Sequence, residues 1–86
     1  MDNELYDFAM VISVSRDCES EWERALRGAK TPAGMTMHVR TPALAMFTVF
    51  AEQEFLAIEM AQQFLLGIAK HAGVHCALNA QPAGEV

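Results

Sequence analysis

The sequence contains few of the residues that mark specialised classes of protein. Of its 86 residues, two are cysteine, three are proline, one is tryptophan and one is tyrosine. Two cysteines are too few for a disulfide scaffold, so we expect free thiols in a reducing cytoplasm. Apolar runs stay shorter than the roughly 18 residues that a membrane-spanning helix needs. The acidic residues 1–7 lack the basic and apolar regions of a signal peptide, and we expect a soluble, cytoplasmic protein with no membrane partner.

Basic side chains are also scarce. Eleven Asp and Glu residues stand against six Lys and Arg residues, which gives a net charge of −5. Proteins that bind nucleic acid use Lys and Arg to contact phosphates, so this balance argues against direct nucleic-acid binding. Residues 44–51 also lack the basic, glycine-containing start of an RNA-recognition strand.

Apolar residues, by contrast, are abundant. They make up 52% of the chain, above the usual share in globular proteins. A chain of this length forms one domain, which we assign to residues 1–86, with residues 81–86 as a frayed tail. One small core does not use all of this apolar material, and we therefore expect a second surface that is buried against a partner.

Alternation of apolar and polar residues predicts four strands. Their expected bounds are residues 6–15, 35–40, 44–51 and 74–80. In the first strand, Phe8, Met10 and Ile12 share one face, and Ala9 and Val11 lie on the other. A short turn joins the second strand to the third, which predicts an antiparallel hairpin.

Two helices are expected between these strands. The first begins near Ser20, because Ser20 and Glu23 have the spacing of a capping box. Trp22 begins the apolar stripe of this helix, so we expect it in the core. The second helix covers residues 52–72, an apolar stretch without proline, and Gly73 suits the position that ends it.

The predicted order of elements is β-α-β-β-α-β. This order covers nearly the whole chain and resembles the ferredoxin-like superfold. The resemblance implies an α+β protein with an antiparallel sheet of spatial order 4-1-3-2, two helices on one face and the other face open. It implies no particular activity, because that superfold hosts many unrelated functions.

The open face of the predicted sheet is the main candidate for a binding surface. On the third strand we expect Leu44, Met46, Thr48 and Phe50 to face the helices, because their volumes suit a core. The open face then has an apolar centre of Val11, Phe47 and Val49. Its rim is polar and consists of His38, Arg40, His75 and Asn79. An apolar centre with a polar rim is typical of a protein–protein interface.

The segment KHAGVHC, residues 70–76, looks at first like a metal site. Gly73 is expected to end the helix between His71 and His75, and adjacent strand residues such as His75 and Cys76 point to opposite sides of a sheet. The three side chains therefore do not converge on one ion. We predict no metal site and no cofactor.

A cluster of acids precedes and begins the first helix. Its members are Asp17, Glu19, Glu21 and Glu23. They complement the helix dipole, and the same charges form a candidate docking patch for a basic partner. Cys18 lies among them, where negative charge disfavours the thiolate that a catalytic nucleophile needs. We predict no catalytic residue here.

These features favour a non-enzymatic interaction protein. We expect a homodimer that also binds another protein, as a regulator or inhibitor. The interface is either the open sheet face or the outer side of the second helix. The alternative is a small dimeric enzyme or ligand-binding domain, including one that senses a metabolite. Its pocket would lie between the open sheet face and a partner subunit and use His38, Arg40 and His75 as polar groups.

Overall fold

A computed structural model of the chain describes residues 2–85. The element order β-α-β-β-α-β is as predicted, with a short 3-10 turn after the first strand and another after the last. The bounds are β1 Glu4–Val14, η1 Arg16–Cys18, α1 Glu19–Gly28, β2 Met35–Thr41, β3 Leu44–Ala51, α2 Glu54–Ala72, β4 Cys76–Pro82 and η2 Ala83–Glu85.

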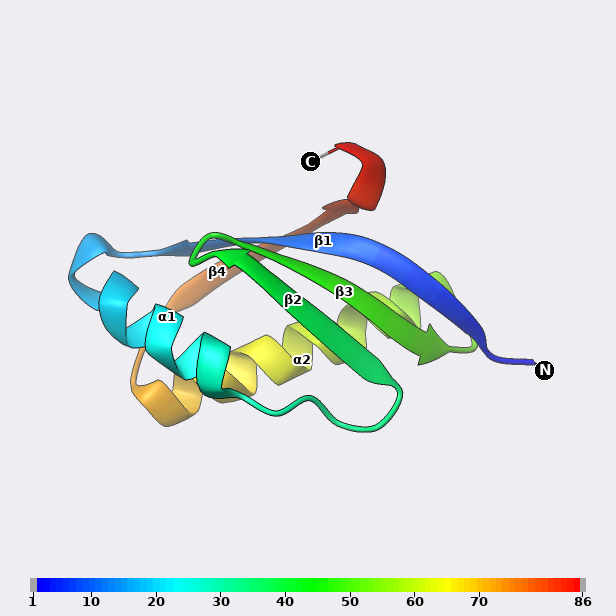
Figure 1. Cartoon of the computed structure of the whole chain (residues 1–86), viewed down its shortest axis with the longest axis horizontal. Helices are drawn as coiled ribbons and strands as arrows, with labels where there is room; N and C mark the ends of the chain where they lie inside the picture. The colour runs from blue at the N-terminus through cyan, green and yellow to red at the C-terminus, as the bar shows by residue number, and fades with distance from the viewer. Residues whose placement is uncertain (1, 86) are drawn as a thin grey trace.

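The four strands form one antiparallel sheet in the order β2-β3-β1-β4 (Figure 1). This confirms the predicted α+β class and the predicted strand order. Buried side chains of both helices belong to a single core cluster with Phe8, Met10 and Ile12 of β1, so both helices cover the same face. β2 and β4 are the edge strands.

α1 attaches to this face through Trp22 and Leu26, both fully buried. The Trp22 Nε1–H group donates a hydrogen bond to the carbonyl oxygen of Pro42, at 2.9 Å. Trp22 therefore links α1 to the turn between β2 and β3 and belongs to the core, as predicted. The helix begins earlier than the capping-box pattern suggests, because the N-cap position falls to Cys18 and Ser20 lies inside the first turn.

α2 packs on the sheet through small residues. Every fourth residue from Ala57 to Ala69 is buried, and alanines at three of these four positions allow the helix to lie close to the sheet. Gly73 ends the helix with a left-handed φ of 73°, as predicted. Across residues 2–85, neither α2 nor α1 combines the length and hydrophobicity that crossing a membrane requires.

The last strand continues further than expected. Gln81 pairs with Ala9 and Pro82 pairs with Phe8, so both residues belong to the sheet. The prediction of a frayed tail from residue 81 is wrong for these two residues. The predicted end of the strand at residue 80 did not account for the length of β1, which extends far enough to pair with both residues.

Candidate interaction surface

The residues of β3 that face away from the helices are not the ones that the sequence predicts. Phe47 and Val49 are buried beneath the helices, 2% and 0% exposed, so placing them on the open face was wrong. Pairing with β1 determines which residues of β3 face the helices. Phe47 lies opposite Phe8, a core residue, and the two rings stack with their centroids 5.8 Å apart. Directly opposed residues of antiparallel strands share a face, so the alternate residues of β3 lie on the open side.

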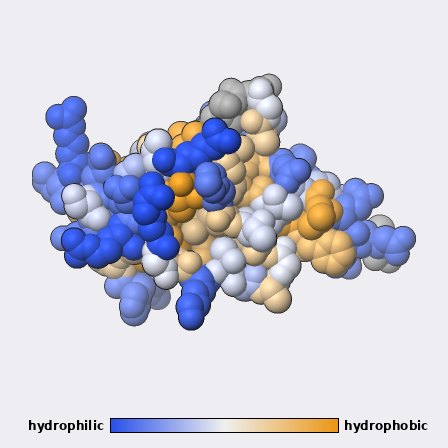
Figure 2. Space-filling view, in the orientation of Figure 1, coloured by the Kyte–Doolittle hydropathy of each residue, from blue (hydrophilic) through white to orange (hydrophobic). Residues whose placement is uncertain are grey.

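The open face nevertheless carries an apolar surface, built from different residues. We call it the sheet-face patch; it consists of Leu5 and Val11 from β1 and Leu44, Met46 and Phe50 from β3. Ala9 of β1 lies on the same face but is fully buried. Leu5 and Phe50 form a cross-strand pair and are 67% and 46% exposed. Figure 2 shows apolar side chains gathered at the end of the molecule where β1 begins and β3 ends. Of the three predicted central residues, only Val11 belongs to this patch.

Polar groups surround the sheet-face patch. His38 on β2 lies opposite Met46, and Asn79 on β4 lies opposite Val11. Arg40 is exposed on the same edge strand as His38. Within the patch, the Thr48 hydroxyl donates a hydrogen bond to the Asp7 carboxylate across the β1–β3 pair. The patch thus combines apolar side chains with the Asp7–Thr48 pair, which lies between Leu5 and Phe50 on one side and Met46 on the other, and with donors and acceptors at its edges.

Within one chain, the two histidines of the alternative ligand pocket lie at opposite edges of the sheet, as the predicted strand order implies. His38 belongs to one edge strand, and exposed His75 immediately precedes the opposite edge strand. His75 lines a hollow of about 380 Å³ beside Lys70 and Cys76 at the end of α2. The larger hollows of the described chain lie along α2, with volumes of about 820 and 600 Å³.

The acidic cluster lies where the sequence places it, at the start of α1. Asp17 is in η1, Glu19 and Glu21 are in the first turn of α1, and all three are exposed. Glu23 accepts a hydrogen bond from Arg27 Nε at 2.9 Å, one helical turn later. One of the four acids is therefore paired within the chain. A docking role for this patch stays a prediction.

The two cysteines occupy unremarkable positions. Both are free thiols and half-buried. Cys76 packs against the core at the start of β4, and this burial raises the pKa of its thiol above the ordinary value. The thiolate is thus disfavoured, which is the opposite of what a nucleophile needs. Within residues 2–85, no group of three or more His, Cys, Asp or Glu side chains is placed to hold a metal ion.

Comparison with known proteins gives no relative: no family model matches the chain, and neither does any curated protein or solved structure. The features that bear on function are those of the chain itself. They are the sheet-face patch, its polar edges and the two hollows along α2.

Proposed function

We propose that the protein is a small, acidic, non-enzymatic interaction protein of the cytoplasm. The chain forms a homodimer through the sheet-face patch and then binds another protein, as a regulator or inhibitor. Its element and strand order support a ferredoxin-like fold, in which one sheet face is left without helices. The proposal rests on one observation: this uncovered face carries exposed Leu5 and Phe50 at one end, and half-buried Val11, Leu44 and Met46 farther along β1 and β3.

An apolar surface of this kind is costly to leave in water. Burying about 400 Å² of apolar surface contributes on the order of 10 kcal/mol before the costs of association. His38 and Arg40 on one edge and Asn79 on the other supply hydrogen-bonding groups around it. A two-fold dimer is the commonest arrangement that covers such a surface with a second copy of itself.

The substitution Met46→Glu tests the proposed dimer. Met46 is half-buried on the open face, between Ala9 on β1 and His38 on β2. A carboxylate there lies beside an imidazole in the monomer, so the fold is retained. In the dimer the same carboxylate is buried without water, which costs several kcal/mol. We expect a dimer for the unmodified protein and a folded monomer for Met46→Glu, measured by light scattering at micromolar concentration.

Two matched variants control for the added charge. Ala33→Glu places the same charge in the exposed loop before β2 and should leave the dimer intact. Val49→Glu places it in the core, at a fully buried position, and should unfold the domain rather than release a monomer. An unmodified protein that is monomeric at these concentrations contradicts the proposed dimer, and so does a Met46→Glu protein that remains dimeric.

A further inference from the structure

The helices cover the sheet unevenly. α2 has 19 residues and α1 has 10. At a rise of 1.5 Å per residue they are about 28 and 15 Å long. α1 lies beside the C-terminal half of α2, where Gly28 and Gly67 line the hollow between them (Figure 1). Beside the N-terminal half of α2, the neighbouring segments are the loop that contains Pro32 and the start of β2. The helix layer is therefore incomplete on that side of α2.

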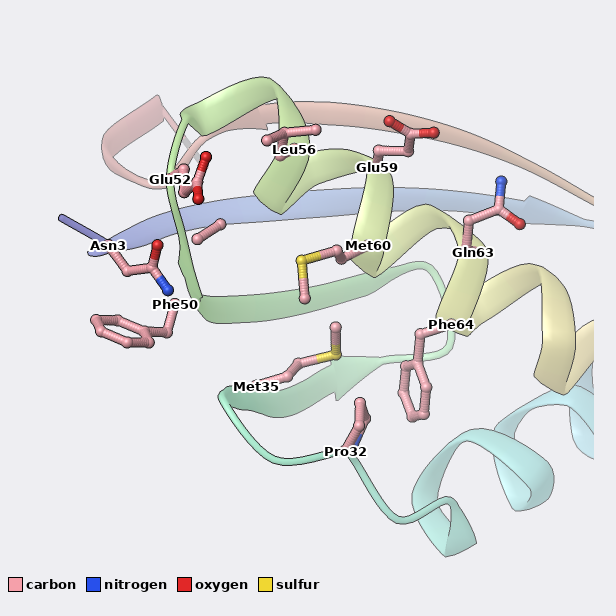
Figure 3. A pocket seen from close by; sticks show the side chains of 11 residues that line it. Asn3, Pro32, Met35, Phe50, Glu52, Leu56, Glu59, Met60, Gln63 and Phe64 are labelled. Atoms are coloured by element: carbon pink, nitrogen blue, oxygen red, sulfur yellow. The ribbon is translucent and has the colours of Figure 1, made fainter. Parts of the chain in front are cut away.

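An apolar groove occupies this gap. Its two hollows share Gln63 and Phe64, so they form one groove along the same flank of α2. Figure 3 shows Met60 and Phe64 reaching from α2 toward Met35 at the start of β2. Met60 is 40% exposed although it points into the groove, and the unbranched thioether of methionine adapts to differently shaped partners.

The two ends of the groove carry opposite charge. Glu52 and Glu59 line the hollow beside the N-terminal half of α2. Arg24, Lys30 and His71 line the hollow at its C-terminal half. Glu52, Glu59, Arg24 and Lys30 are exposed, and so are free to contact a partner at the rim. A partner that fits this groove carries basic groups at one end and acidic groups at the other.

We propose that this groove binds one amphipathic helix of a partner protein, antiparallel to α2. The helix lays its apolar face on Met60 and Phe64 and completes the unfinished layer. Its basic end lies over Glu52 and Glu59, and its acidic end lies over Arg24 and Lys30. Acidic residues favour the N-terminal turn of a helix and basic residues the C-terminal turn, and this preference fixes the antiparallel direction. The inference deepens the proposed function, since it names the surface and chemistry for the second protein.

A second copy of this chain fits the groove poorly. In a two-fold dimer each copy would present the same concave groove to the other copy. Two concave surfaces leave a gap between them. Head to tail, the outer side of α2 offers exposed Phe55 and Leu66 as a ridge. That contact joins two different surfaces, so it leads to rings or open chains of molecules rather than a two-fold dimer.

Two synthetic peptides of about 14 residues, or 21 Å as a helix, test the proposal. Both have apolar residues at helical spacing. One has Glu at its N-terminal end and Lys at its C-terminal end, and the other has these charges exchanged. We expect the first peptide to bind about tenfold more tightly at low salt, with the preference shrinking as salt is added. Fluorescence anisotropy of labelled peptide measures this ratio.

The first peptide is also the better helix former, because its charges complement its own helix dipole. A protein with exchanged charges controls for this difference. Glu52→Lys and Glu59→Lys combined with Arg24→Glu and Lys30→Glu change only exposed groups, and we expect the preference to reverse. Both proteins are measured with and without Met46→Glu. Phe50 belongs to the sheet-face patch and also lines the groove, but Met46 lines neither hollow of the groove. Failure of the dimer and failure of the groove therefore give different results.

Methyl NMR signals of the methionines locate the bound peptide. The signals of Met35 and Met60 should shift and that of Met46 should not. The proposal is overturned if neither peptide binds, if the preference is unchanged on the charge-exchanged protein, or if the Met46 signal shifts instead of those of Met35 and Met60. Shifts of Met35 and Met60 that depend on protein concentration alone, without peptide, assign the groove to a second copy and also overturn it.

Discussion

Replacing Trp22 by alanine removes the largest fully buried side chain of the protein. The loss combines buried apolar area, the cavity left behind, and the hydrogen bond from Nε1 to the Pro42 carbonyl at 2.9 Å. Truncating a buried Trp to Ala costs about 3–5 kcal/mol. A domain of this size has a free energy of unfolding of about 4–13 kcal/mol, so Trp22→Ala removes a large part of it.

Trp22→Phe is the matched variant. It keeps an aromatic ring under the sheet but loses the hydrogen bond, which is worth about 0.5–1.5 kcal/mol, and some packing. We therefore expect a cost of about 1–2 kcal/mol for Phe, well below the cost for Ala. The order of stability should be Trp, then Phe, then Ala.

Urea unfolding followed by far-ultraviolet circular dichroism measures these differences. Fluorescence does not serve for the variants, because Trp22 is the only tryptophan. A Trp22→Ala protein within about 1 kcal/mol of the unmodified protein would refute the placement of Trp22 in the core. The same result combined with a lost dimer would make Trp22 a contact residue instead.

Three further predictions concern the end of α2 and the start of β4. Gly73→Ala should lower the free energy of unfolding, measured in urea, by about 1 kcal/mol, because Gly73 has a φ of 73°. Gly67→Ala should raise the free energy of unfolding instead, because Gly67 lies in the interior of α2 with open space around it among residues 2–85. Burial raises the pKa of Cys76, so the unfolded chain releases this proton first. The free energy of unfolding should then fall as pH rises above the ordinary value of 9.0, more steeply than in Cys76→Ala, and equal slopes would contradict this. Elemental analysis of natively purified protein should find no stoichiometric zinc; zinc that disappears from the variant with His71 and Cys76 both changed to Ala would show a metal site.

The sequence determined the elements, because their signals are local. Alternation in β1 identified both the strand and its buried face, since Phe8, Met10 and Ile12 are large and their neighbours are small. Gly73 marked the end of α2 because its left-handed conformation disfavours other residues. The hairpin of β2 and β3 followed from the short turn between them.

The tertiary structure decided which face of β3 is buried. Both faces of that strand are apolar, so residue volume favoured the wrong one. The usable signal was the pair of alanines, Ala45 and Ala51, whose small side chains leave room for the helices above. Phe50 was missed as a patch residue for the same reason. Leu5 was missed because the predicted strand began at residue 6, whereas β1 begins at Glu4 and pairs Leu5 with Phe50.

The groove along α2 also depended on the tertiary structure. The sequence showed a long, largely apolar α2 and a shorter α1, but not where the shorter helix would lie. Packing placed α1 beside the C-terminal half of α2 and left Met60 and Phe64 facing a gap. Periodicity records which residues share a side of their own helix or strand. Which neighbour, if any, covers that side is fixed by contacts between segments far apart in the chain, and no local pattern encodes them.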